Sequence, residues 1–229
     1  MPGLSLQHEW LFEEDFFGGG TFGTAGQYDP WVATLTGTTP TCARVDLGES
    51  TVSGAIGSVS MGLSATDEVQ NACLSFGDVL AFDMDKLRGF EARIKLGQSA
   101  LVAASSVAFG MTGDRNDAID SIAVAAIFRV VGADDTTAVV LENDDGTNTN
   151  DDVASGTTLL NAWKTFRIDF PAGNASCTYW VDNIQVGSAT TFSLAAHHGG
   201  VQPFFQIQKT GGVTAHSIQI DYVKIWGVR

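Results

Sequence analysis

Apolar residues that recur at every second position limit the fold of this chain more than any other feature. In residues 90–96, Phe, Ala, Ile and Leu alternate with Glu, Arg and Lys, and residues 165–170 and 217–222 repeat the pattern. Successive side chains of a β-strand point to opposite faces of a sheet, so each segment is predicted to be a strand with one buried face. The best candidate for a short helix is 78–88, and no longer amphipathic helix is indicated.

Further segments, rich in apolar residues and bounded by Gly, Thr, Ser, Asn or Asp, are also predicted to be strands. They are 11–17, 31–35, 42–47, 57–61, 69–76, 105–111, 122–131, 137–142, 177–181, 184–186 and 203–209. Between two of them, Asp182-Asn183 predicts a two-residue hairpin turn, since both residue types tolerate positive φ. Without helices to cover a parallel sheet, the chain is predicted to form an all-β antiparallel β-sandwich.

A single domain is predicted for the whole chain. Its 229 residues are an ordinary size for one β domain, and 44% hydrophobic with 17% charged residues provides a core. The 26 glycines are spread along the chain, and the polar run 143–152 is predicted to be one long loop. We expect an N-terminal arm over residues 1–10 and the sandwich over 11–229. Candidate partner-binding residues of the arm are Leu4, Leu6 and Trp10.

The net charge excludes two classes of partner. With 26 acidic and 12 basic side chains the formal charge is −14, and the bases form no cluster. Phosphate backbones and anionic lipid headgroups repel such a protein, so we expect neither nucleic acid nor a membrane as partner. The sequence starts without a signal-peptide pattern, and no apolar run reaches the ~20 residues of a membrane span, so we expect synthesis in the cytoplasm.

Several short motifs follow one another along the chain. They are Glu13-Glu14-Asp15-Phe16-Phe17, FEARIK at 90–95, WKTFRI at 163–168, YWVDN at 179–183 and IDYVKI at 220–225. Their order resembles that of concanavalin A-like jelly rolls of the laminin G and glucanase type, over about residues 9–229. The resemblance implies a strand that ends in Val-Asp-Gly just before a hairpin, and in this chain Asn183 stands in place of the Gly. It also implies that the last strand pairs near the first strand.

The acidic, Gly- and Thr-rich character of the chain is similar to that of virion structural proteins of tailed bacteriophages. This similarity implies a non-enzymatic capsid decoration or cement protein that binds the major capsid protein or another virion lattice protein. We expect a homo-oligomer on the virion surface, made in the host cytoplasm, and the sequence leaves open whether it also binds host glycans. The alternative function is a carbohydrate-binding, lectin-like module, and a glycoside hydrolase ranks third.

Catalytic carboxylates are the feature that a hydrolase of this fold needs. Retaining glucanases carry acids at positions i, i+2 and i+4 of one strand, because alternate residues share a face and the two reacting carboxyl groups must lie about 5 Å apart. Acidic i, i+2 pairs occur here, but none has a third member. The pairs are Glu13/Asp15, Asp83/Asp85 and Glu142/Asp144. Since nucleophile-elbow, phosphate-loop and dinucleotide patterns are also missing, we expect no enzymatic activity.

The sequence contains only weak candidates for metal-binding sites. Within 143–152 the calcium candidates are Asp144, Asp145, Asp151 and Asp152, but their spacing does not match an EF-hand loop, and a hydrated loop is the simpler interpretation. The same holds for a second group, Asp114, Asp117 and Asp120. Adjacent His197 and His198 would point opposite ways on a strand. We therefore expect no metal and no other cofactor.

Two remaining residue types leave alternatives open. The cysteines are Cys42, Cys73 and Cys177, which form no CxxC pair, so we expect buried thiols, with one disulfide as the alternative. The tryptophans are Trp10, Trp31, Trp163, Trp180 and Trp226. In a sandwich most of these are expected in the core, and the alternative is an exposed platform on which sugars stack.

Overall fold

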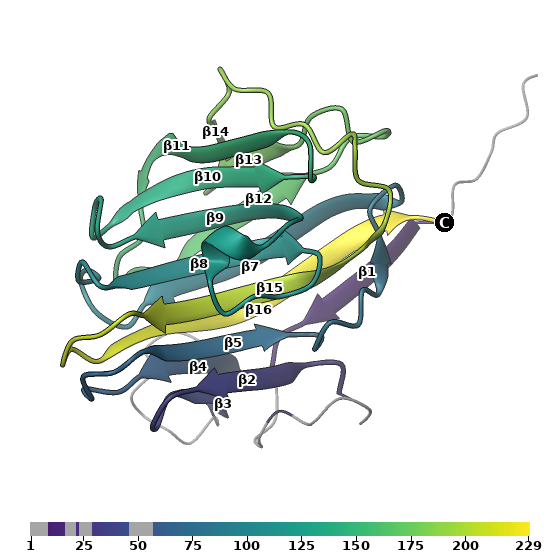
Figure 1. The fold of residues 1–229 in the computed structure, drawn as a ribbon. Helices are drawn as coiled ribbons and strands as arrows, with labels where there is room; N and C mark the ends of the chain where they lie inside the picture. Colours follow the sequence, from purple (N-terminus) through teal and green to yellow (C-terminus); the bar gives the residue numbers. More distant parts are fainter. Residues whose placement is uncertain (1–8, 17–21, 23–28, 46–56) are drawn as a thin grey trace, which may run out of the picture.

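Two eight-stranded antiparallel sheets stack face to face in the computed structural model, which describes residues 9–16, 22, 29–45 and 57–229 (Figure 1). Sheet A has the strand order β14-β13-β12-β7-β16-β4-β3, with β1 paired to the end of β16. Its strands are β1 (Glu9–Glu14), β3 (Thr41–Val45), β4 (Ser58–Leu63), β7 (Leu87–Leu96), β12 (Lys164–Asp169), β13 (Thr178–Val181), β14 (Ile184–Val186) and β16 (His216–Val228).

Sheet B has the order β11-β10-β9-β8-β15-β5-β2, and the short β6 also pairs with β15. Its strands are β2 (Val32–Thr36), β5 (Gln70–Ser75), β6 (Phe82–Asp83), β8 (Ser105–Thr112), β9 (Ala125–Val131), β10 (Ala138–Asp144), β11 (Thr149–Thr158) and β15 (Gly200–Lys209). Among the described residues, the one helical element is the 3-10 turn η1 (Ile119–Ser121), and no helix there is long and apolar enough to cross a membrane.

The predicted antiparallel sandwich is confirmed by the burial of the alternating segments. In β7 the apolar residues from Phe90 to Leu96 are buried between the sheets, while the charged residues between them lie on the outer face. The core between the sheets includes the large side chains of Trp31, Phe90, Phe109, Phe128, Phe166, Tyr179 and Phe205. Alternate burial therefore leaves each sheet one core face and one outer face, the face turned away from the other sheet.

The hairpin after β13 also forms as predicted. Asp182 and Asn183 have φ values of 49° and 65°, and Val181 pairs with Ile184 on either side of them. The Asp182 carboxylate accepts a hydrogen bond from the backbone N–H of Thr165 at 2.9 Å. The turn is thus tied to the neighbouring strand, and Asn183 takes the left-handed conformation that glycine would otherwise supply.

The predicted helix over 78–88 is wrong. Gly77 and Asp78 have φ values of 65° and 64°, and the short strand β6 and a turn follow. The Asp83 carboxylate accepts a hydrogen bond from the backbone N–H of Asp85 at 3.0 Å. Such local bonds offer the backbone an alternative to helix formation.

The polar run 143–152 is a hairpin and not the predicted long loop. Strand β10 continues to Asp144 and β11 begins at Thr149, so the turn itself is short. Strand β11 lies at the edge of sheet B and is largely exposed. An exposed edge strand needs no alternation of apolar residues, which explains why the sequence did not indicate it.

The N-terminal boundary differs from the prediction as well. Strand β1 begins at Glu9 and pairs with the last strand, β16, so the predicted adjacency of first and last strands is confirmed. Trp10, predicted to bind a partner, stacks on Phe82 with 5.2 Å between ring centroids. Its indole N–H donates to the carbonyl of Val228 at 3.2 Å. Glu9 and Trp10 therefore belong to the sandwich, while Leu4 and Leu6 lie outside the described residues.

Candidate functional site

Part of the outer face of sheet B is covered by the chain itself. The covering segment, Gly113–Val124, connects β8 to β9 and lies in front of β8 and β15 (Figure 1). Its side chains of Ile119 and Ile122 are buried in a hydrophobic cluster distinct from the main core. Their neighbours in this second cluster are Cys73, Ala108, Ala125, Ile127 and Phe204. The middle of this sheet face is thus occupied by side chains of the same protein. Two cavities flank it, one of about 250 Å³ lined by Thr36, Asn71 and Lys209 among others, and one of about 240 Å³ lined by Val131, Val140 and Asp152 among others.

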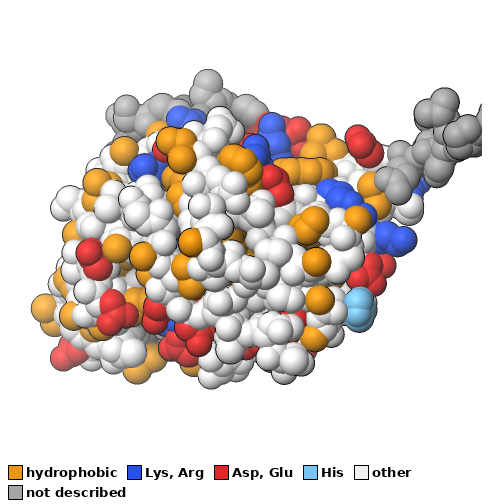
Figure 2. Space-filling view, turned by 90° about the horizontal axis from the view of Figure 1, so that it is seen from above, with side chains coloured by type: hydrophobic (Ala, Val, Ile, Leu, Met, Phe, Trp, Pro, Cys, Tyr) orange, Lys and Arg blue, Asp and Glu red, His pale blue; other side chains and the backbone are white. Residues whose placement is uncertain are grey.

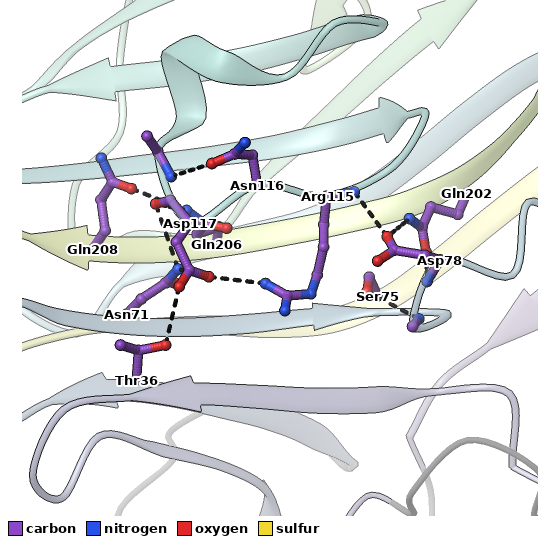
Figure 3. Close-up of polar contacts among 12 residues, drawn as sticks. Thr36, Asn71, Ser75, Asp78, Arg115, Asn116, Asp117, Gln202, Gln206 and Gln208 are labelled. Atoms are coloured by element: carbon purple, nitrogen blue, oxygen red, sulfur yellow. Dashed lines mark hydrogen bonds and ion pairs between the residues drawn. The ribbon is translucent and has the colours of Figure 1, made fainter.

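Asp117 fixes the middle of the covering segment (Figure 3). Its carboxylate accepts hydrogen bonds from Arg115 at 2.8 Å, from Asn71 at 3.1 Å and from Thr36 at 3.2 Å. Its backbone carbonyl accepts one from the buried Gln206 at 2.9 Å. The sequence suggested Asp117 as part of a weak oxygen cluster, but both carboxylate oxygens already have partners from neighbouring strands and from the segment.

The start of the covering segment has its own anchor. Gln202, fully buried on β15, donates to the Gly113 carbonyl at 3.0 Å and to the Asp78 carboxylate at 2.8 Å. The same carboxylate accepts the backbone N–H of Arg115 at 2.8 Å (Figure 3). Hydrogen bonds at two points along the segment hold it in one position on the sheet.

A buried ion pair lies beside the covering segment. Arg129 on β9 pairs with Glu142 on β10 at 3.0 Å, both side chains being 9% exposed, and Arg129 also pairs with Asp120 of the segment. Burial raises the pKa of Glu142 to about 7, although Arg129 acts in the opposite direction. A carboxylic acid with such a pKa resembles a general acid, so this is the strongest catalytic candidate in the described residues.

The pocket at Glu142 is small for a substrate. Its volume is about 100 Å³, and it is lined by Ile119, Asp120, Ile122, Ala125, Ile127, Glu142, Asn143, Asp144 and Asp151. Sites for small organic ligands usually enclose about 300–1,000 Å³. Glu142 and Asp144 share this pocket, as expected for an i, i+2 pair on one strand, but the residue two positions earlier is Val140. The pocket therefore lacks the third carboxylate of the glucanase pattern.

The calcium candidates are not brought together as a site. Asp144 ends β10, Asp145 lies in the turn, and Asp151 and Asp152 belong to β11. The Asp145 carboxylate accepts backbone hydrogen bonds from residues 147, 148 and 196 at 2.6–2.9 Å. Burial alone would raise its pKa, but these bonds and one from the Asn148 amide lower it to about 2. In the described part of the chain, no three His, Cys, Asp or Glu side chains are placed to hold a metal ion.

A row of side chains crosses the outer face of sheet A. Reading across five strands in register, it runs Trp180 on β13, Arg167 on β12, Glu91 on β7, Lys224 on β16 and Glu13 on β1. The charges in this row alternate from strand to strand. Opposite charges on facing positions of antiparallel strands attract, so the row is internally neutral and stabilises the pairing.

The basic side chains of this face lie over aromatic rings. The contacts are Arg167 over Trp180 at 4.8 Å, Arg93 and Lys95 over Trp163 at 5.2 and 4.9 Å, and Lys224 over Tyr222 at 5.1 Å. The ion pairs are Arg93–Asp221 at 2.6 Å, Lys224–Glu13 at 3.0 Å and Arg167–Asp169 at 3.1 Å. We call these residues, with Glu91 and Trp226, the cation–aromatic face.

The tryptophans divide between the two environments that the sequence left open. Trp31 is fully buried in the core, and Trp10 packs against Phe82. Trp163, Trp180 and Trp226 are half-buried in the cation–aromatic face. The cysteines are all buried and free, as expected.

Comparisons with known proteins identify the fold. No family model matches the sequence, and no curated protein matches it. Among solved structures, a glucanase of glycoside hydrolase family 16 from Bacteroides ovatus, in complex with a mixed-linkage glucan product, aligns with a TM-score of 0.61. It is 15% identical, and the alignment covers 93% of this chain and 99% of that chain. The chain has a concanavalin A-like jelly-roll fold.

Other structures share this jelly roll. A protein of unknown function from Shewanella oneidensis MR-1 aligns with a TM-score of 0.63 and 13% identity, over 96% of this chain and 87% of that one. The carbohydrate recognition domain of Emp47p aligns with a TM-score of 0.57 and 12% identity, over 86% and 88%. At identities of 12–15% the similarity establishes the fold alone. The concanavalin A-like fold that the sequence resemblance implied is therefore confirmed.

Proposed function

We propose that this jelly roll is a non-enzymatic binding protein that attaches to an assembled protein lattice, namely the capsid of a tailed bacteriophage, which it decorates and stabilises. The observation that carries the proposal is the covered middle of the outer face of sheet B. Segment Gly113–Val124 fills this part of the face with its own Ile119 and Ile122, and its hydrogen bonds hold it there. Surface contact with a macromolecule is the mode of action that this arrangement supports best.

Hydrolysis is disfavoured by the surroundings of Glu142. One of its carboxylate oxygens is bound by Arg129, and its pocket is smaller than a sugar-binding cleft requires. A retaining glycosidase needs a nucleophile and an acid about 5 Å apart on either side of the sugar bond. In the pocket of this chain, the Asp120 carboxylate approaches Arg129 as well. Arg129, Glu142 and Asp120 are therefore paired with one another.

Attachment to a lattice fits the rest of the molecule. Two packed sheets with one continuous core form a rigid body, and the pairing of β1 with β16 fixes the start of the described chain to its end. The charge of −14 disfavours contact with packaged DNA and suits an exposed position on a particle. A homo-oligomer would present several copies of one contact, and multivalent contact turns weak single interfaces into stable attachment.

Co-sedimentation tests this proposal. Capsids that lack the protein are mixed with it at micromolar concentration and pelleted, and we expect the protein in the pellet. A variant lacking residues 1–8 shows whether the segment with Leu4 and Leu6 contributes to binding. If the full-length protein remains in the supernatant with intact capsids, the proposed function is wrong.

A carbohydrate-binding module is the second candidate. Trp163, Trp180 and Trp226 are half-buried on one sheet face, where aromatic rings can stack on sugars. The cations over Trp163 and Trp180 already occupy ring faces, which favours the first proposal. A glycan array distinguishes the two functions, because saturable binding to one glycan class, quenched in a Trp180→Ala variant, would favour the lectin function.

A further inference from the structure

We infer that the larger cavity beside the covering segment is a docking pocket, and that it takes one uncharged apolar side chain and its backbone N–H from a segment of the lattice protein. The inference rests on the proposed function and adds to it the place of contact and the chemistry of the partner. We call this space of about 250 Å³ the edge cavity; its lining includes Thr36, Val69, Asn71, Asp117, Ala118 and Lys209.

The edge cavity lies where a partner can reach it. Strand β2 ends the strand order of sheet B, and its last residue, Thr36, forms one wall of the cavity. Val69, just before β5, forms another and is 63% exposed. Ala118 of the covering segment, which is also exposed, completes the rim. Apolar surface is thus available at the border of the sheet.

The charged groups that line the edge cavity are already paired. Lys209 is buried, and its ammonium donates to three backbone carbonyls, those of residues 64, 66 and 212, at 2.6–2.8 Å. The Asp117 carboxylate accepts hydrogen bonds from three side chains (Figure 3). A charged group that entered the cavity would lose its water without gaining a free counter-charge. The lining therefore favours an uncharged partner group.

Asn71 leaves one hydrogen-bond acceptor without a partner at this cavity. The residue is 3% exposed, and its amide nitrogen donates to the Asp117 carboxylate at 3.1 Å. Its side-chain oxygen, Oδ1, has no hydrogen-bond partner among the described residues. Buried polar groups in native proteins nearly always have a partner, and a buried acceptor that lacks one is unfavourable. A bound N–H group would supply the missing donor.

The volume of the edge cavity suits a side chain. Sites for small organic ligands usually enclose about 300–1,000 Å³, more than the 250 Å³ available here. An apolar cavity of about 150 Å³ is known to hold one benzene molecule. The edge cavity therefore has room for a leucine or phenylalanine side chain together with the backbone N–H of the same residue.

A flat contact would hold such a side chain less well. In the view of Figure 2, hydrophobic side chains form separate spots among polar and acidic ones. Single exposed apolar residues are normal on soluble proteins and do not mark a binding site. A cavity surrounds an apolar group on several sides, so it removes more of the group's surface from water. The edge cavity is thus a better contact point than the surface in this view.

Two substitutions close the edge cavity in different ways. Val69→Glu places a charge at its wall, and Ala118→Phe fills it with a ring from the covering segment. Val79→Glu and Ala172→Phe make the same changes at exposed positions outside the cavity and serve as matched controls. Thermal melting verifies that each variant is folded, and co-sedimentation with capsids that lack the protein then measures binding over a range of concentrations.

The expected result is a loss that is specific to the cavity. We expect Val69→Glu and Ala118→Phe to weaken binding at least tenfold, with both controls close to the unmodified protein. If all four variants bind like the unmodified protein, or if the controls lose as much, the docking pocket is wrong while the proposed function stands. If the unmodified protein does not sediment, the proposed function fails and this inference fails with it.

A small probe distinguishes a peptide partner from a sugar. N-acetyl-leucine amide carries a leucine side chain and amide N–H groups, whereas methyl glucoside carries hydroxyl donors. We expect the leucine probe, at millimolar concentration, to shift the backbone NMR signals of Val69 and Asn71, and Val69→Glu to abolish the shift. No shift with the leucine probe would contradict the inference, and shifts with the glucoside alone would favour the carbohydrate-binding module.

Discussion

The guanidinium of Arg129 lies 3.0 Å from the carboxylate of Glu142 on the adjacent strand, and both side chains are 91% removed from solvent. The pair sits on the outer face of sheet B, where Asp120 of the covering segment completes it. Arg129 thus links the covering segment to strands β9 and β10.

Removal of Arg129 alone should destabilise the protein. Arg129→Met removes the cation that lowers the pKa of Glu142, so this buried carboxyl is protonated at neutral pH. We expect the free energy of unfolding to fall by about 1–3 kcal/mol, because the Glu142 carboxyl loses its buried hydrogen-bond donor. The double variant Arg129→Met/Glu142→Leu removes both charges and should recover most of this loss. Urea denaturation at neutral pH measures both, and a double variant less stable than the single one would contradict the account.

Glu142 should give stability a dependence on pH. Its pKa is raised from 4.5 to about 7, chiefly by burial, so the folded protein binds this proton more tightly than the unfolded chain does. Its contribution is therefore present below pH 4.5 and is lost as the pH rises to about 7. Compared with Glu142→Gln, which cannot ionise, the unmodified protein should lose stability across this range. A constant difference between the two would refute the assignment.

His216 should act in the opposite direction. The side chain is 3% exposed, neither ring nitrogen has a hydrogen-bond partner among the described residues, and burial and Lys209 lower its pKa below 6.5. The unfolded chain therefore takes up a proton first, and the contribution of His216, present above pH 6.5, is lost as the pH falls through the lowered pKa. His216→Leu should flatten the decline in unfolding free energy on the acid side. An unchanged acid limb in that variant would show that other groups cause it.

Chelation of metal ions should leave the protein unaffected. Asp145, the best-connected of the calcium candidates, is already hydrogen-bonded to three backbone N–H groups. We expect the same melting temperature with and without excess chelator, whereas Asp145→Ala should cost about 1–2 kcal/mol because those donors lose their acceptor. A clear fall in melting temperature with chelator, restored by calcium, would establish a metal site.

The sandwich could be predicted because alternation along one strand, as in Phe90–Leu96, reflects burial of one sheet face and needs no knowledge of other strands. The turn at Asp182-Asn183 could be predicted for the same reason, because it depends only on the two residue types at the turn. The edge strand β11 was missed because exposed edges carry no such pattern, and 78–88 was misassigned because positive φ at Gly77 and Asp78 is not visible in sequence.

The candidate sites were less accessible to sequence reasoning. The row from Trp180 to Glu13 joins five strands that are distant in the chain, and only their register makes neighbours of its members. The covering of part of sheet B by Ile119 and Ile122 depends on a connection without periodicity. The Glu142/Asp144 pair was visible, but the burial of Glu142 and its partner Arg129 were not.

Calorimetry of capsids tests the central claim most directly. Capsids that lack the protein are heated alone and with a saturating amount of it, and the temperature of capsid disruption is recorded. A lattice-binding decoration protein stabilises the assembled state to which it binds, so the account predicts a higher disruption temperature that depends on protein concentration. An unchanged disruption temperature at saturating protein would contradict it.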